Sequence, residues 1–106
     1  MPVSNLIYSC VAINIELEEY DKAIVILKDM IARRNTLKVT QVEIAEALGG
    51  IGVAYAKSHR YNAAIRYLEQ SLFVYEIPFF REQLYEVREL MGLAPFGHKI
   101  RRRFKV

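Results

Sequence analysis

Two stretches of helical periodicity lie on either side of a short polar break between residues 51 and 72, and they restrict the fold more than any other feature. Apolar residues recur there at intervals of three and four, which is the spacing of helices that bury one face. The break, Lys57-Ser58-His59-Arg60, is long enough only for a tight antiparallel turn. Because the small residues Gly52 and Ala64 fall where the two helices would cross, we expect a closely packed helical hairpin.

The same pattern occurs earlier in the chain at a constant offset of 41 residues. The second helix of the earlier copy carries Tyr20, Ala23, Ile24, Leu27 and Ile31, whose mutual spacing is that of Tyr61, Ala64, Ile65, Leu68 and Leu72. In the preceding helix the places of Ile51, Gly52 and Tyr55 are taken by Cys10, Val11 and Asn14. Two copies in a fixed register indicate a repeat.

The residues Ile51, Gly52, Tyr55, Tyr61, Ala64, Ile65 and Leu72 resemble the spacing of a tetratricopeptide (TPR) repeat. The chain departs from that pattern at Leu48 in place of Trp, Leu68 in place of an aromatic residue, Ser71 in place of Ala, and a displaced Pro78. The resemblance implies an all-α fold in which antiparallel helical hairpins stack as a short TPR-like solenoid of about five helices. The repeats would span about 4–37 and 45–78, with a covering helix at 79–92, in one domain over 1–97 that precedes a basic tail at 98–106.

Helix signals place the expected elements. Ser4 can cap a first helix to about residue 17, a second follows at about 20–34, and Thr40 can cap a third to about residue 57. A fourth helix at about 61–75 is ended by Pro78, because the residue before a proline is pushed away from helical dihedral angles. The fifth should bury a stripe made of Leu84, Val87, Leu90 and Met91.

The first helix is more apolar than one buried face requires. Its self-association candidates are Leu6, Ile7, Val11 and Ile13, together with Ile15, and they cover more than the stripe of about 100° that a surface helix needs. We predict a homodimer that buries this surplus about a two-fold axis. A different protein, or a missing upstream repeat, is the competing interpretation. We interpret the lone Cys10 on this helix as a small core residue, and a reactive thiol is the alternative.

Three glycines at positions 49, 50 and 52 interrupt the third helix, each at a cost of about 1 kcal/mol relative to Ala. The family pattern explains Gly52. Gly49 and Gly50 either permit close helix crossing or leave the floor of a groove open to a ligand backbone, and the sequence leaves both interpretations open.

The resemblance implies that a protein or peptide partner lies along the concave face made by the first helix of each hairpin. On this sequence that face carries Asn5, Tyr8, Ala12, Ile15, Gly49, Val53 and Lys57, with Gln83 and Val87 added by the last helix. Some TPR relatives hold the acidic tails of heat-shock chaperones with Lys and Asn at inner positions. Here those positions are Tyr8, Ala12 and Gly50. We therefore do not expect this chain to bind chaperone tails. We expect an interaction module that acts as a scaffold or adaptor.

Charge is concentrated in the tail, where Lys99, Arg101, Arg102, Arg103 and Lys105 contribute +5 to a net charge of +3 and leave the rest of the chain at −2. Such an arm is either solvated or binds a polyanion, such as RNA or an anionic membrane surface. The acidic residues from Glu16 to Asp21 fit a solvated turn near a helix N-terminus better than a calcium loop.

No His, Cys or Ser stands at a spacing that indicates a metal site or an activated nucleophile, so we expect neither an enzyme nor a cofactor. No stretch approaches the roughly 20 apolar residues of a membrane span, and the N-terminus lacks the features of a secretory peptide. We therefore expect a soluble cytoplasmic protein.

Overall fold

The computed structural model describes the backbone of residues 3–92 and the side chains of residues 6–92. These residues form helices and turns without a strand, which confirms the all-α fold class. The helices are α1 (Val3–Glu16), α2 (Tyr20–Ala32), α3 (Arg34–Leu37), α4 (Gln41–Lys57), α5 (Tyr61–Val74) and α6 (Pro78–Leu90). Within the described part of the chain, no helix is both long enough and apolar enough to cross a membrane.

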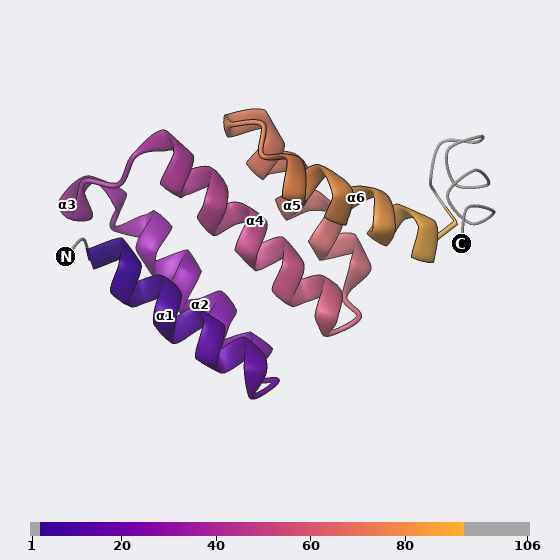
Figure 1. The fold of residues 1–106 in the computed structure, drawn as a ribbon, viewed down its shortest axis with the longest axis horizontal. Helices are drawn as coiled ribbons and strands as arrows, with labels where there is room; N and C mark the ends of the chain where they lie inside the picture. Colours follow the sequence, from indigo (N-terminus) through magenta and orange to yellow (C-terminus); the bar gives the residue numbers. More distant parts are fainter. Residues whose placement is uncertain (1–2, 93–106) are drawn as a thin grey trace.

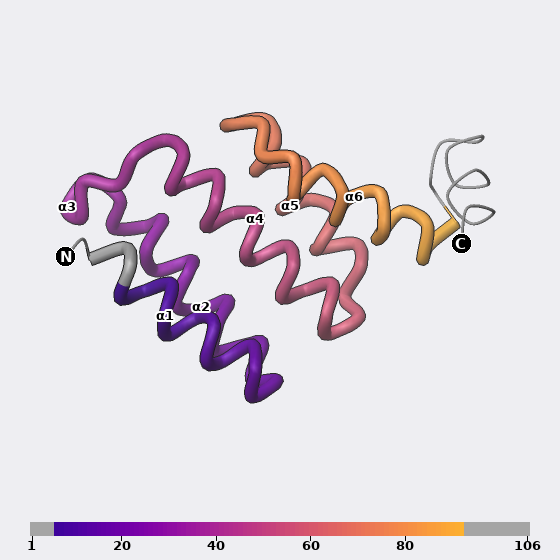
Figure 2. Tube along the Cα trace, in the orientation of Figure 1, coloured from indigo at the N-terminus to yellow at the C-terminus, as the bar shows by residue number. Residues whose placement is uncertain are grey.

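Two antiparallel hairpins and a final helix stack side by side. The hairpins are α1–α2 and α4–α5, and α6 follows α5 at the other end of the stack (Figure 1). The main contacts join α1 to α2, α2 to α4, α4 to α5 and α5 to α6. In the trace of Figure 2, α1, α4 and α6 run in the same direction on the near side. We call the side formed by these three helices the front face.

The 41-residue offset recurs in the backbone of the two hairpin turns. Glu18 and His59 both adopt the left-handed conformation, with φ of 60° and 64°. The amide of Glu19 donates to the carbonyl of Asn14, and the amide of Arg60 donates to the carbonyl of Tyr55, each at 2.8 Å. Corresponding residues of the two turns are therefore 41 positions apart in the sequence. Residues of α1 and α4 can be compared position by position with the same offset.

Local signals explain where α4 and α6 begin. Thr40 caps α4 as expected, because its Oγ1 accepts from the Glu43 amide at 3.1 Å while the Glu43 carboxylate accepts from the Thr40 amide at 2.9 Å. Pro78 stands in the first turn of α6, where a missing N–H costs nothing. Ser4, in contrast, lies inside α1 and is not its N-cap residue. The second helix ends at Ala32, and the four-residue α3 that follows it was not expected.

Each glycine of α4 faces a different neighbouring helix. A Cβ on Gly49 would overlap the ring of Phe80 in α6, and one on Gly50 would lie 3.0 Å from Leu27 in α2. A Cβ on Gly52 would lie 2.7 Å from Leu68 and 3.2 Å from the Ala64 carbonyl oxygen in α5. The packing interpretation therefore holds for Gly49 and Gly50, and the expected crossing of Gly52 with Ala64 is present.

The core forms two clusters, one where α2 and α4 meet with α1 and one between α5 and α6. Phe80 belongs to the second cluster and was not among the residues expected to be buried. Two expectations are wrong: Leu90 is exposed on the outside of α6, and Cys10 is exposed on α1. Both lie on helix sides that no other described helix covers.

Candidate functional site

Tyr8 connects α1 to α4 on the front face. Its hydroxyl donates to the Glu43 carbonyl oxygen at 3.2 Å and lies 3.2 Å from a carboxylate oxygen of Glu46. Burial raises the pKa of Tyr8 above its ordinary value, and the nearby charge of Glu46 raises this pKa further. The hydroxyl of the half-buried Tyr8 therefore serves to join the two hairpins rather than to bind a ligand.

This raised pKa predicts how stability responds to alkaline pH. Below about pH 10, the ordinary tyrosine pKa, the residue is neutral in both the folded and the unfolded chain. As pH rises further, the unfolded chain ionises first, so the contribution of Tyr8 to stability is lost. In urea titrations above pH 10, the free energy of unfolding of the wild type should fall more steeply than that of Tyr8→Phe. Parallel curves for the two proteins would contradict this assignment.

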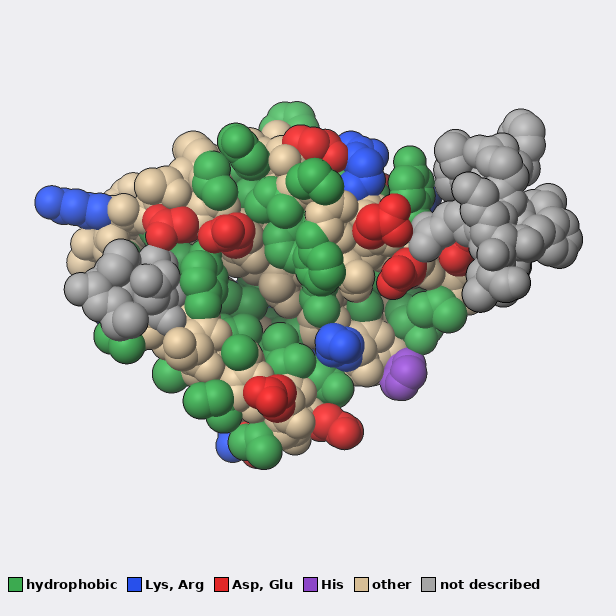
Figure 3. Space-filling model, viewed as in Figure 1, with side chains coloured by type: hydrophobic (Ala, Val, Ile, Leu, Met, Phe, Trp, Pro, Cys, Tyr) green, Lys and Arg blue, Asp and Glu red, His purple; other side chains and the backbone are tan. Residues whose placement is uncertain are grey.

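The remaining concave-face positions do not form one accessible surface. Gly49 lies beneath the ring of Phe80 and Val87 is buried in the second cluster, so neither can touch a ligand in this structure. Ile15 packs against the first cluster, and the side chain of Asn5 lies outside the described residues. Ala12 and Lys57 are exposed and Gln83 is half-buried, whereas Val53 packs against the second cluster. In Figure 3, hydrophobic side chains gather along the middle of the front face with acidic side chains on either side.

The predicted self-association residues divide between two sides of α1. Val11 is only 7% exposed and belongs to the first cluster, and Ile7 is half-buried against that cluster, so neither lies on the exposed side of α1. Leu6 and Ile13 are each 57% exposed. The exposed cysteine Cys10 and the 64% exposed Leu17 complete the outward side. We call Leu6, Cys10, Ile13 and Leu17 the outer stripe.

The outer stripe follows the free edge of α1, where Figure 3 shows hydrophobic side chains at the lower left of the molecule. Its spacing of four, three and four residues keeps the side chains on one side of the helix. Leu17 follows the last residue of α1, and its amide still donates to the Ile13 carbonyl at 3.0 Å, so it keeps the helical register. On α2, Val25 is also exposed and borders a shallow groove together with Asn14 of α1. Sequence reasoning missed Leu17 and Val25, although the four-three-four spacing was a signal for Leu17.

The 41-residue offset relates this stripe to a buried surface of the same protein. Leu6, Cys10 and Ile13 correspond to Ala47, Ile51 and Ala54 of α4. Those three residues are fully buried, and they share the first cluster with four residues of α2, which are Ala23, Ile24, Leu27 and Met30. In α4, these positions pack against α2, the second helix of the preceding hairpin. The outer stripe is the same surface on α1, where no described helix covers it.

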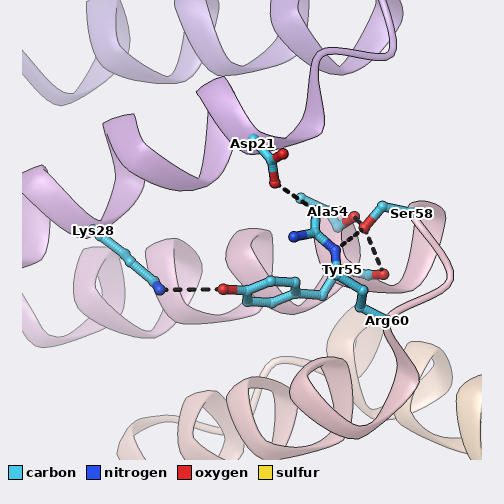
Figure 4. A network of polar contacts seen from close by, with 6 residues as sticks. All are labelled: Asp21, Lys28, Ala54, Tyr55, Ser58 and Arg60. Carbon is cyan, nitrogen blue, oxygen red and sulfur yellow. Dashed lines mark hydrogen bonds and ion pairs between the residues drawn. The ribbon is translucent and has the colours of Figure 1, made fainter.

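A polar network connects α2 with α4 and with the turn that follows α4 (Figure 4). Lys28 of α2 donates to the Tyr55 hydroxyl at 3.2 Å, and this hydrogen bond raises the pKa of Lys28. The Lys28 ammonium lies 5.4 Å from the ring centre of Tyr67, and the Arg60 guanidinium lies 4.9 Å from that of Tyr55. Arg60 also pairs with Asp21 at 2.6 Å. Lys28 and Arg60 therefore each contact residues of other helices. Such contacts fit a structural role for the network.

Phe73 on α5 is 93% exposed and borders a shallow groove with Leu48, but its neighbours Arg66, Glu69 and Gln70 are polar. No group of three or more His, Cys, Asp or Glu side chains that could hold a metal occurs among the described residues. The predicted polyanion-binding residues Lys99, Arg101, Arg102, Arg103 and Lys105 lie outside the described residues.

Comparison with known proteins adds no relative: no protein-family model matches the chain, and no curated protein matches it.

Proposed function

We propose that the protein is a protein–protein interaction module whose partner packs a helix against the outer stripe of α1. The supporting observation is the equivalence of α1 and α4. Three positions that α4 buries completely against α2 are occupied in α1 by the exposed residues Leu6, Cys10 and Ile13. A helix that packs inside a single hairpin needs only one apolar side, and α1 has two.

Apolar burial supplies enough free energy for such a contact. Complete burial of an aliphatic side chain stabilises by about 1.5 to 3 kcal/mol. Leu6, Ile13 and Leu17 retain more than half of their exposure, so covering them would contribute roughly 3 to 5 kcal/mol before the costs of association. That amount fits a weak or transient complex, and it would increase if the partner also covered Val25.

A peptide that lies along the front face is the second candidate. The hydrophobic band with flanking acidic side chains in Figure 3 supports it. The accessible positions Ala12 and Lys57 remain available for such a contact. The outer stripe has the stronger support, because its members are exposed and apolar, whereas the front-face set has lost Gly49 and Val87 to the core.

The location that best fits this module is the cytoplasm. The only cysteine of the chain is exposed on the outer stripe, and an exposed thiol is compatible with a reducing compartment. As a scaffold or adaptor of this kind, the protein would act through contacts between helices.

Site-specific photocrosslinking in the native cell can test both surfaces. A benzoylphenylalanine at Ile13 reports on the outer stripe, one at the neighbouring exposed Ala12 reports on the front face, and one at exposed Asn62 on α5 is the matched control. We expect a discrete protein adduct at position 13 and none at position 62. Adducts at position 12 alone would mean that the partner binds the front face instead of the outer stripe. Equal labelling at all three positions, or none, would refute the proposal.

A further inference from the structure

The outer stripe has a pattern that reads the same in both directions along the helix. Leu6, Cys10, Ile13 and Leu17 are separated by four, three and four residues. In an antiparallel pair of identical helices, Leu6 would lie opposite Leu17 of the second copy, and Cys10 would lie opposite Ile13. This is the spacing of core positions in paired helices, where side chains recur on average every 3.5 residues.

We infer that the partner of the outer stripe is a second copy of this chain, packed through α1 against α1 in an antiparallel, two-fold symmetric dimer. This inference rests on the proposed function and names the partner. The chain itself shows that these positions accept a packed helix, because the corresponding residues of α4 pack against α2 in the first cluster. A two-fold axis lets one patch serve both molecules.

Charge favours the antiparallel direction. Glu16 in the last turn is the only charged residue of α1. An antiparallel arrangement places each Glu16 beside the amino-terminal end of the opposing helix, where the helix dipole favours a negative charge. A parallel arrangement would instead bring the two Glu16 carboxylates to the same end of the interface and make them repel.

The size of the contact places the dimer at the weak end of protein interfaces. A helix of 14 residues is about 21 Å long, so the paired helices bury less than a standard interface. Sedimentation equilibrium of the full chain at about 10 to 300 µM should show a reversible rise toward twice the monomer mass. Ile13→Lys should abolish this rise without changing the circular dichroism spectrum, because residue 13 is exposed in the monomer. Phe73→Lys, at an exposed position on α5, is the matched control and should dimerise normally.

Disulfide crosslinking tests the geometry, because Cys10 is the only cysteine of the chain. With helix axes 8 to 10 Å apart, the two Cys10 Cα atoms would be roughly 6 Å apart, within the range for a disulfide. Diamide removes two electrons and two protons from the pair of thiols and is reduced to the hydrazine. It should therefore give a covalent dimer, at a rate that Ile13→Lys reduces at least tenfold.

Engineered cysteines distinguish the two helix directions. In a Cys10→Ser background, Leu6→Cys chains and Leu17→Cys chains should crosslink to each other when mixed, and neither should crosslink to itself. Crosslinking of each variant only to itself would overturn the antiparallel arrangement. A monomer with native helicity at 300 µM, or a dimer unaffected by Ile13→Lys, would overturn the second copy as partner. If that monomer still yields an adduct with a different protein at position 13 in cells, the proposed function stands and only the dimer fails.

Discussion

Replacing Phe80 by alanine is expected to destabilise the protein by about 3 kcal/mol and to lower its melting temperature by roughly 15 °C. The ring is buried where α6 crosses α4, in the space that a Cβ on Gly49 would otherwise occupy. Its removal leaves a cavity, and α6 retains only Leu84 and Val87 as buried side chains. Thermal and urea denaturation measure the loss. Phe79→Ala is the matched control, because the neighbouring ring is largely exposed and should matter little.

A double substitution tests whether Phe80 and Gly49 act as a pair. In the wild type, Gly49→Ala places a methyl group against the ring and should destabilise despite its gain of about 1 kcal/mol in helix propensity. In the Phe80→Ala background the same methyl enters the vacated space, so Gly49→Ala should be neutral or stabilising. A coupling energy of at least about 1 kcal/mol is expected, and simple additivity would show that the two residues do not pack together.

Gly52→Ala should destabilise the protein by about 2 kcal/mol even though alanine favours helix. The new methyl would lie 2.7 Å from Leu68 Cγ and 3.2 Å from the Ala64 carbonyl oxygen, and that backbone atom cannot rotate away. The axes of α4 and α5 would have to separate along the hairpin.

Gly50→Ala supplies the matched control two residues away on the same helix. Its methyl would meet only a terminal methyl of Leu27, at 3.0 Å, and that side chain can adjust. We therefore expect Gly50→Ala to lie within about 1 kcal/mol of the wild type, since the gain in helix propensity offsets the tighter contact. Equal stabilities of the Gly50→Ala and Gly52→Ala proteins would contradict the crossing described for α4 and α5.

Local pattern was sufficient for elements whose signals lie within a few residues. The capping pair Thr40 and Glu43 locates the start of α4, and the single apolar side of residues 61–74 defines α5. The crossing of Gly52 with Ala64 could be predicted because both residues belong to one hairpin, so their separation in space follows from a short turn.

Other features depend on contacts between distant residues. Phe80 is buried because Gly49, 31 positions earlier, leaves room for its ring, and no periodicity within α6 reveals this. The four residues of α3 are too few to carry a helical pattern. In α1 both sides are apolar, so periodicity could not decide whether Val11 or Ile13 faces α2; the packing of the hairpin makes Val11 the buried residue. Two of the four predicted self-association residues, Ile7 and Val11, therefore lie on the packed side of α1.

Most contacts join helices that are close to one another along the chain. This arrangement affects the order in which the protein folds during its synthesis. The α1–α2 hairpin needs no later residue to close its turn, because Glu18 and Glu19 bond back to Ile15 and Asn14. Such short-range closure is fast and carries a small loss of chain entropy. Until α4 leaves the ribosome, however, the side of α2 that will cover Ala47, Ile51 and Ala54 remains uncovered. The nascent chain therefore has an interval in which its first hairpin is formed but apolar on both outer sides, and α4 ends that interval.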